Sequence, residues 1–278
     1  MAAGKLLLIG TPIGNLGDLS PRALDALRSC DTLLCEDTRH TGKLLAYFGV
    51  QARLESFHDF NEDQKTDRVI ERIAGGETIA LVSDAGMPVL SDPGFPLIRR
   101  ARLAGLAVEP IPGPFAAALA LAASGLPPLP FAFFGFVPHR SAERRELYRR
   151  LAALEMTVVV YESAERILES LADARLAFGD ADMTLAREMT KLHEELVHGT
   201  IGEVIDRLST RERIRGEITL VIAAPAIAAV EADPERIRDE FHRLRNEGVR
   251  RPDAAKILAE RYRLRKSDLY RMLLDEDG

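Results

Sequence analysis

The sequence LVSDAGMPVLSDPG, residues 81–94, joins an apolar run to two turns that contain aspartate and glycine. The run ETIALVSD (77–84) is continuously apolar before its polar end, which is typical of a strand buried on both faces of a sheet. Ser91 and Asp92 can cap helices, but capping alone hardly explains two such turns at one strand end. The stretch therefore predicts a buried strand with a ligand-binding loop at its carboxyl end.

Similar apolar runs recur along the chain and alternate with amphipathic stretches of helical period. The other runs are KLLLIG (5–10), TLLCED (32–37), AVEPIPG (107–113), MTVVVYES (156–163), DMTLARE (182–188) and GEITLVIA (216–223). One intervening stretch, SPRALDALRSC, has Ser20 as its predicted N-cap and Pro21 at the first helical position. Strands that alternate with helices predict an α/β fold.

Glycine or polar residues gather where these runs end. The clusters are Gly10–Pro12, Glu36–Arg39, Ser83–Gly86, Pro112–Pro114, Tyr161–Ser163 and Arg187–Glu188. In open α/β sheets, ligands bind in the crevice at the carboxyl ends of the strands, where backbone N–H groups converge. We therefore expect these clusters to line one site.

The length of 278 residues, with 46% hydrophobic and 29% charged residues, suggests two domains and a small appendage. We place an N-terminal α/β domain at residues 1–113, a C-terminal α/β domain at 114–226 and a basic helical tail module at 233–278. The stretch rich in proline and aromatic residues at 124–139 interrupts the strand-helix alternation and is interpreted as a hinge or lid loop.

Several classes of protein are disfavoured. No apolar run reaches the roughly 18 residues that span a bilayer, and the start lacks a signal peptide, so we expect a cytoplasmic protein without a membrane partner. Cys30 and Cys35 are interpreted as reduced thiols. His193 and His198 form no HExxH pattern, which leaves a metal site unsupported, and Walker A and G-x-S-x-G motifs are missing.

From Arg243 to Arg271 the basic residues of the tail clearly outnumber the acidic ones, although the whole chain has a formal net charge of -6. A helix over Ala254 to Ala259, a short turn and a second helix with Ser267 as its N-cap are predicted. This spacing resembles a helix-turn-helix, and a simple helical hairpin remains an alternative. A local basic tail can hold RNA on an acidic protein.

EDTRHT, residues 36–41, places two carboxylates, a guanidinium and an imidazole in six positions. Arg39 can bind a phosphate, and His40 or Asp37 can move a proton. A solvated helix start is the alternative. Such a mixture of charges at a strand end nevertheless favours a polar substrate.

Eight collinear blocks of the chain resemble the tetrapyrrole methylase superfamily, and more narrowly its ribosomal RNA methyltransferase branch. They are TPIGNLGD, EDTRHTGKLL, LVSDAGMPVLSDPG, PIPGPFAAALAL, GFVPHR, VVYESAERI, LAREMTKLHEE and GEITLVI. The resemblance implies two α/β domains with a cleft between them, S-adenosylmethionine bound in the cleft, and a homodimer. It also implies 2'-O-methylation of a cytidine in the decoding region of 16S ribosomal RNA in the small subunit, with no DNA partner.

The resemblance also assigns residues. Cofactor contacts fall on Pro12, Ser83, Asp84, Ala85, Gly86, Asp92, Gly113, Pro114, Tyr161, Glu162, Ala186, Thr219 and Leu220. It assigns catalytic roles to Asp37, His40 and Lys191. It assigns contacts with the RNA to Glu36, Arg39, Arg263, Arg265 and Lys266. Met87 departs from the family, which commonly has Thr there, so a hydroxyl near the ligand is lost at this position.

Two rival functions remain. A methyltransferase acting on a tetrapyrrole ring would share the fold, but such a small substrate has no evident need for EDTRHT or a basic tail. A non-catalytic RNA-binding factor for ribosome assembly would use the tail and keep only a vestigial pocket. Binding of S-adenosylmethionine separates an enzyme from such a factor.

Overall fold

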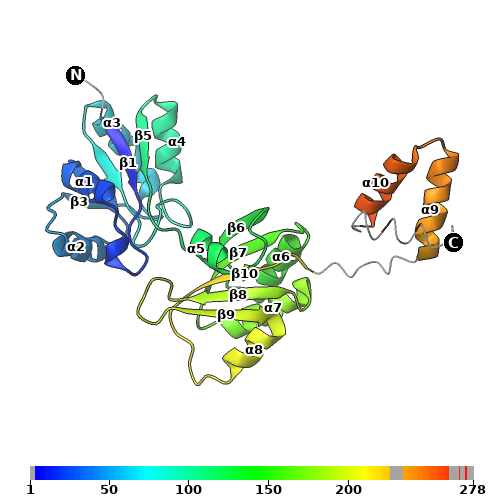
Figure 1. The fold of residues 1–278 in the computed structure, drawn as a ribbon. Coiled ribbons are helices and arrows are strands. Elements are labelled where there is room, and N and C mark those ends of the chain that lie inside the picture. Colours follow the sequence, from blue (N-terminus) through cyan, green and yellow to red (C-terminus); the bar gives the residue numbers. More distant parts are fainter. Residues whose placement is uncertain (1–3, 226–233, 263–268, 270–272, 274–278) are drawn as a thin grey trace. The chain divides into compact units, whose positions relative to one another are not determined.

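The computed structural model describes residues 4–225, 234–262, 269 and 273 (Figure 1). The chain divides into two compact units, Met1–Ala224 and Pro225–Gly278. The described part of the first unit contains two five-stranded sheets, with strand orders β3-β2-β4-β1-β5 and β6-β7-β10-β8-β9. We call each sheet with its helices a lobe: the N-terminal lobe spans residues 4–111 and the C-terminal lobe spans 116–222.

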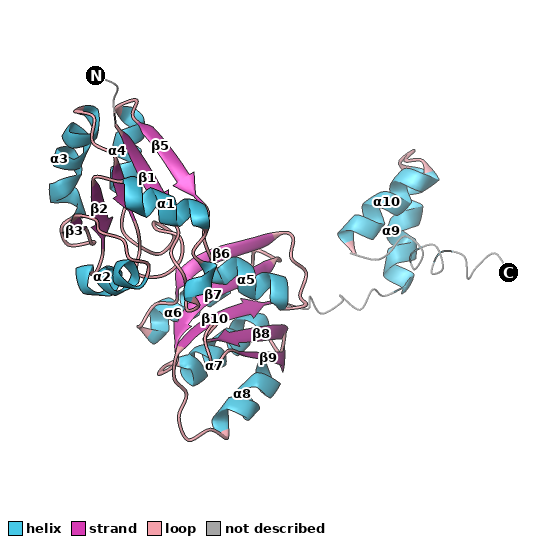
Figure 2. Ribbon diagram, turned by 60° about the vertical axis from the view of Figure 1, so that its left-hand side comes forward, coloured by secondary structure: helices cyan, strands magenta, loops and turns pink. Residues whose placement is uncertain are grey.

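The N-terminal lobe is a three-layer structure. Its elements are β1 (Lys5–Ile9), η1 (Leu16–Asp18), α1 (Pro21–Ser29), β2 (Thr32–Cys35), α2 (Thr38–Tyr47), β3 (Leu54–Ser56), α3 (Glu62–Ala74), β4 (Ile79–Leu81), α4 (Phe95–Leu103) and β5 (Ala107–Ile111). All its strand pairs are parallel. Helices α1 and α2 pack on one face of the sheet, and α3 and α4 pack on the other (Figure 2). The carboxyl ends of its strands therefore meet at one edge.

Local sequence explains how these helices start. The Ser20 hydroxyl accepts a hydrogen bond from the N–H of Ala23, and Pro21 occupies the first turn of α1, which confirms the predicted cap. Asp37 caps α2, where its Oδ1 accepts hydrogen bonds from the N–H groups of Arg39 and His40. The acidic end of the second strand is thus also a helix start.

The C-terminal lobe has a mixed sheet. Its elements are α5 (Ala116–Ala123), β6 (Phe131–Phe136), α6 (Ser141–Ala152), β7 (Thr157–Ser163), α7 (Ile167–Phe178), β8 (Asp182–Arg187), β9 (Glu195–Thr200), α8 (Ile201–Ser209) and β10 (Glu217–Ile222). Strands β6 and β7 are parallel, but β10 runs antiparallel to both β7 and β8, and β9 is antiparallel to β8. The amino end of β10 consequently lies beside the carboxyl ends of β7 and β8.

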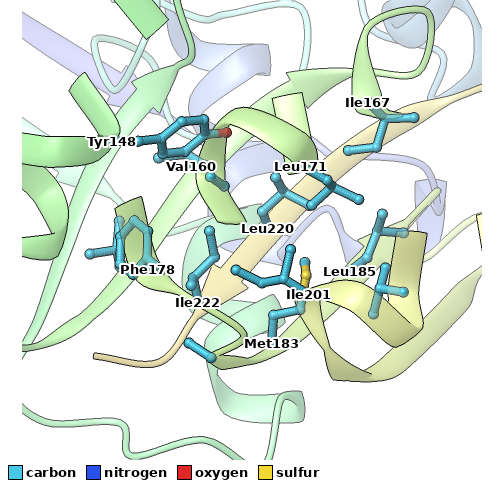
Figure 3. Close-up of a cluster of buried hydrophobic side chains, with 14 of the residues drawn as sticks. Tyr148, Val160, Ile167, Leu171, Phe178, Met183, Leu185, Ile201, Leu220 and Ile222 are labelled. Atoms are coloured by element: carbon cyan, nitrogen blue, oxygen red, sulfur yellow. The ribbon is translucent and has the colours of Figure 1, made fainter. Parts of the chain in front are cut away.

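Helices cover both faces of the sheet in this lobe, and a separate hydrophobic cluster lies on each face. Helices α6, α7 and α8 cover one face through a cluster that includes Tyr148, Leu171 and Leu220 (Figure 3). Helix α5 covers the opposite face against Val159 and Val221. Because side chains alternate along a strand, neighbouring residues of β7 and β10 face either this core or the α5 side.

The α/β class with two lobes is confirmed, whereas three strands were not predicted. Strand β6 lies in the stretch interpreted as a hinge or lid loop, so residues 131–136 are corrected to a strand. Strands β3 and β9 were also missed. The prediction that the runs are buried on both faces is wrong for β5, whose middle residues are exposed or half-buried because it is an edge strand.

The second unit contains α9 (Pro234–Asn246) and α10 (Arg251–Arg261). Ile237 and Phe241 of α9 pack against Ala254 and Leu258 of α10, and Leu269 joins this cluster. The helix predicted over Ala254 to Ala259 lies within α10. Most of the second predicted helix, including Ser267, lies outside the described residues. None of the described helices is both long and apolar enough to cross a membrane.

Candidate active site

A cavity of about 540 Å³ lies within the first unit, between loops of the two lobes. This volume is typical of small-molecule sites. Its N-terminal wall is formed by Ile13, Asp84, Ala85, Gly86, Met87, Leu90, Ser91 and Asp92. Phe115 and Ala116 lie at the join, and the C-terminal wall is formed by Phe136, Tyr161, Glu162, Ser163, Ala164, Glu165, Ala186, Met189, Arg213, Ile214, Arg215, Gly216, Glu217, Ile218 and Thr219.

The turn after β4 is joined to the loop after β1. The N–H of Thr11 donates to the carbonyl of Gly86 at 2.9 Å, and the N–H of Gly86 donates to the carbonyl of Thr11 at 3.1 Å. The buried Ser83 hydroxyl lies 3.3 Å from the carbonyl oxygens of Ala85 and Gly86. Ser83 therefore shapes the turn from within and does not line the cavity, while Asp84, Ala85 and Gly86 do.

The following loop has a rare backbone conformation. Val89 and Ser91 have positive φ angles of 77° and 76°. A positive φ is strained for a β-branched residue, and such strain persists where the surroundings impose it, often at functional sites. The N–H of Gly94 donates to Oε2 of Glu62 at 2.8 Å, which anchors the end of the loop. The loop thereby presents Ser91 and Asp92 to the cavity.

Three predicted cofactor residues in the loops after β1 and β5 do not line the cavity. Pro12 is buried, and neither Pro12, Gly113 nor Pro114 lines the cavity. Gly113 instead lies directly against Gly10, so close that a Cβ on either would stand 2.6 Å from the other's Cα. The contact between Gly10 and Gly113 therefore fixes the positions of the two loops that carry the cavity residues Ile13 and Phe115.

Carboxylates cluster on the N-terminal wall. Burial, followed by the nearby charge of Glu36, raises the pKa of Asp92 to about 6. Burial and the charge of Asp84 also raise the pKa of Glu36. Asp84 accepts a hydrogen bond from the N–H of Asp37 at 3.3 Å. This wall is thus acidic, and part of that charge depends on pH near neutrality.

Asp92→Asn should stabilise the fold at pH 7.5 and have little effect at pH 4. The pKa of Asp92 is raised from 3.8 to about 6, so the folded state binds more protons than the unfolded state between these values. Stability then falls as pH rises through that window. After allowance for solvent screening of a half-exposed group, the gain at pH 7.5 is about 1 to 2 kcal/mol. Urea unfolding at both pH values measures it.

Asp206→Asn, at an exposed position of α8, is the matched control because it removes the same charge away from the cavity. Equal effects of the two substitutions at pH 7.5, or a destabilised Asp92→Asn protein, would contradict the raised pKa.

An aromatic group forms part of the C-terminal wall. The ring of Tyr161 lies 5.0 Å from that of Phe133 and 5.3 Å from that of Phe136, and Phe133 contacts Phe115 edge to face. Burial raises the pKa of Tyr161 to about 12, so its hydroxyl stays protonated at neutral pH. The cavity therefore offers a flat, apolar surface suited to a planar ring.

Glu162 lines the cavity, and one of its carboxylate oxygens is engaged in the neighbouring turn, whereas the buried Oε2 has no hydrogen-bond partner among the described residues. Its Oε1 accepts hydrogen bonds from the N–H of Ser163 at 2.7 Å and from Nη2 of Arg166 at 2.6 Å. Its side chain is buried. The ion pair with Arg166 holds the turn between β7 and α7 and so fixes this part of the cavity wall.

The two predicted residues of β10 behave differently because they alternate across the sheet. Thr219 lines the cavity, whereas Leu220 is fully buried in the core under α6 to α8. Ala186 of the neighbouring β8 lies opposite Thr219 and also lines the cavity. Contact between Leu220 and a ligand is therefore confined to its backbone.

Among the described residues with a predicted catalytic or RNA-contacting role, none lines the cavity: these are Glu36, Asp37, Arg39, His40 and Lys191. The hydrogen bond from the N–H of Arg39 lowers the pKa of Asp37, which makes this carboxylate a weaker base than usual. Glu36, Arg39 and His40 are exposed beside it. Asp37 joins this group to the cavity through its bond to Asp84.

Lys191 lies in the loop between β8 and β9. Its ammonium contacts Glu188 at 2.9 Å and Glu217 at 3.1 Å. Burial lowers the pKa of Lys191, but the bonds to these two carboxylates outweigh it and raise the pKa overall. A lysine held in this way remains a cation at neutral pH and is not a proton acceptor.

Some residues were missed and some are outside the described structure. Arg263, Arg265 and Lys266 lie among the residues that the structure does not describe. The loop at 213–217 lines the cavity but was not predicted, because it precedes a strand and carries no glycine-aspartate pattern. Among the described residues, no group of His, Cys, Asp and Glu is arranged to hold a metal ion.

The fold and cavity define a two-lobed α/β protein with a ligand site between its sheets, and the family follows from sequence. The family described as Tetrapyrrole (Corrin/Porphyrin) Methylases matches residues 5–205. The chain therefore belongs to the tetrapyrrole methylase family, as its motifs predicted.

Within the family, the chain is similar to proteins named Ribosomal RNA small subunit methyltransferase I. The relative from Escherichia coli O157:H7 is 39% identical over 99% of this chain and 96% of its own length. The relative from Xylella fastidiosa is 42% identical over 92% and 94%, and that from Vibrio cholerae is 40% identical over 98% and 95%. The similarity extends through the tail.

Solved structures share the fold at low sequence identity. A diphthine synthase aligns with a TM-score of 0.62 and 16% identity over 79% of this chain and 90% of its own. The methyltransferase CobJ aligns with a TM-score of 0.61 and 17% identity over 82% and 95%. These likenesses support the two-lobed fold alone.

Proposed function

We propose that the protein transfers a methyl group from S-adenosylmethionine to the ribose 2'-oxygen of a cytidine in the decoding region of 16S ribosomal RNA. The observation that carries this proposal is the similarity, at about 40% identity over nearly the whole chain, to ribosomal RNA small subunit methyltransferase I. The cavity and its acidic and aromatic walls are compatible with the cofactor.

The cavity residues fit S-adenosylmethionine. The ring of Tyr161 and its aromatic neighbours suit an adenine, and the carboxylates of Asp84 and Asp92 suit a sulfonium cation or ribose hydroxyls. The Gly86 turn exposes backbone close to a ligand. When bound, the cofactor supplies an electrophilic methyl group, which needs in-line approach of a nucleophile.

Protein residues then have to position the ribose and accept its proton. We assign the acceptor to His40, because a neutral imidazole nitrogen can accept a proton. Asp37 positions the start of α2, which carries His40. Lys191 remains a cation and contributes positive charge, and Glu36 and Arg39 face the RNA in this proposal.

The remaining assignments concern organisation and partners. We propose domains at residues 1–113, 114–226 and 233–278. The last is a basic helical module, and we propose that it binds ribosomal RNA through its Arg263, Arg265 and Lys266. A homodimer is supported by exposed aromatic residues on the edge strand β6, where Phe131 and Phe134, which do not line the cavity, are 38% and 40% exposed. A ribosomal substrate places the protein in the cytoplasm.

Mass spectrometry of ribosomal RNA tests the function. A strain that lacks the protein should lose one methyl group from one cytidine ribose of 16S RNA, and the purified protein with S-adenosylmethionine should restore it on small subunits. Unchanged methylation in the deletion strain would reject the proposal. If the purified protein methylated a tetrapyrrole ring and not the subunits, the chain would instead be a tetrapyrrole methyltransferase.

A further inference from the structure

The loop that precedes β10 brings two arginines to the cavity. Arg213 and Arg215 both line it, and both are exposed. Ile214 between them is half-buried and packs against the core of the C-terminal lobe. Ile214 also lines the cavity, so residues 213–215 form one segment of its wall, and the exposed side chains of Arg213 and Arg215 lie at the cavity and in solvent.

The backbone of this loop is fixed by neighbouring residues. Nη1 of Arg187 donates to the carbonyl of Arg215 at 3.2 Å. Gly216 has a φ of 97°, and a Cβ there would lie 2.5 Å from Cγ of Glu188. Oε1 of the same Glu188 accepts a hydrogen bond from the N–H of Glu217 at 2.9 Å. The arginines therefore extend from a preorganised backbone.

The two guanidinium groups lack acidic partners. Their neighbours Arg187 and Arg211 both form ion pairs with Glu195. Within the described ranges, neither Arg213 nor Arg215 has a carboxylate within ion-pair distance. Glu165 lies on the same wall and is exposed, but no ion pair joins it to either arginine. Two unpaired guanidiniums at a cavity are suited to an external anion.

The opposite wall carries the reverse charge. Asp84 and Asp92 line it, with Glu36 close to both. A polyanion is repelled from that wall and attracted to the loop of Arg213 and Arg215. Phosphate contacts of this kind set the position and orientation of a nucleic acid.

We propose that Arg213 and Arg215 bind the phosphodiester groups that flank the target nucleotide and so position its ribose for methyl transfer. This inference rests on the proposed function and specifies how the substrate is held. The guanidinium fork matches two phosphate oxygens, which favours arginine over a simple point charge. A carboxylate of the cofactor is the competing anion, and the experiment below distinguishes the two.

The test compares the full-length wild type with Arg213→Ala/Arg215→Ala, using purified small ribosomal subunits. A hydrogen bond to a charged group contributes about 1.5 kcal/mol or more, so subunit binding should weaken roughly tenfold for each arginine. The slope of log K against log salt should decrease by roughly 1.4 to 1.8. Affinity for S-adenosylmethionine, measured by calorimetry, should stay within about twofold.

Controls make the result specific. Arg102→Ala removes an exposed arginine of α4, outside the cavity, and should leave subunit binding and its salt slope unchanged. Arg213→Lys/Arg215→Lys keeps the charges and should retain the salt slope but lose part of the affinity. These results together would support a phosphate contact.

Two results would overturn the inference. One is a double alanine variant that binds subunits as Arg102→Ala does, with the same salt slope. The other is a matching loss of affinity for S-adenosylmethionine, which would assign the arginines to the cofactor carboxylate. If the wild type transfers no methyl group to subunits, the proposed function fails, and the binding and salt measurements still decide whether these arginines contact phosphate.

Discussion

His40→Ala is expected to slow methyl transfer to small ribosomal subunits by about 100-fold or more, with affinity for S-adenosylmethionine within about twofold of the wild type. Loss of a positioned general base typically costs 10²- to 10⁴-fold in rate. His40 lies in the first turn of α2, outside the cavity lining, so its removal should leave the cofactor contacts intact. Single-turnover rates with saturating subunits measure the effect.

Asp37 tests whether this end of α2 acts through charge or through position. Its carboxylate caps the helix by accepting hydrogen bonds from Arg39 and His40. Asparagine caps a helix about as well as aspartate but cannot accept a proton. If Asp37 only positions His40, Asp37→Asn should keep most of the rate, while Asp37→Ala should lose a substantial part of it.

His139→Ala, an exposed histidine between β6 and α6, is the control and should transfer methyl at the rate of the wild type. Normal turnover of both His40→Ala and Asp37→Ala would remove these two residues from the mechanism. A large loss in Asp37→Asn would transfer the role of base to Asp37 in spite of its lowered pKa.

Gly113→Ala should damage both the fold and the site. A Cβ on Gly113 would lie 2.6 Å from Cα and 2.7 Å from the carbonyl carbon of Gly10, and these backbone atoms cannot rotate away. The adjacent parallel strands β1 and β5 would have to separate where they are paired through Ile9 and Ile111. Overpacking of this kind costs about 2 to 3 kcal/mol.

The same displacement moves the cavity wall. Ile13 and Phe115 follow these two strand ends and line the cavity, so affinity for S-adenosylmethionine should fall at least about tenfold. Denaturant unfolding and calorimetry measure the two effects. Gly75→Ala is the control, since its backbone is helical and its new Cβ would meet neighbours at an ordinary 3.4 Å. Wild-type stability and binding in Gly113→Ala would refute this account.

Sequence alone predicted most of the strands, and those it missed share one property. Strands β3, β6 and β9 each lie at the edge of a sheet. An edge strand is paired on one side only and is less buried, so continuous apolar runs are not required there. Phe131 and Phe136 of β6 are exposed, and β9 contains the exposed His198. The rule that detects central strands therefore missed three of the four edge strands and found only β5, whose run is apolar.

The candidate site was also predicted in part: its local features were found, and its long-range contacts were not. The glycine-aspartate turn after β4 and the polar end of β7 could be read from the chain, because strand ends and turn residues are local features. Eight of the cavity residues were predicted: Asp84, Ala85, Gly86, Asp92, Tyr161, Glu162, Ala186 and Thr219. The sequence also indicated a Gly113 turn but gave no sign that it lies against Gly10.

The sequence by itself determined the α/β class, the central strands, the family and the loops at their carboxyl ends, since each depends on residues that are close in the chain. Only the tertiary structure decided that β10 runs antiparallel between β7 and β8. That reversal brings Arg213 and Arg215, from the amino end of a strand, to the same cavity as Asp84. Strand direction depends on pairing between distant segments, which local patterns do not record.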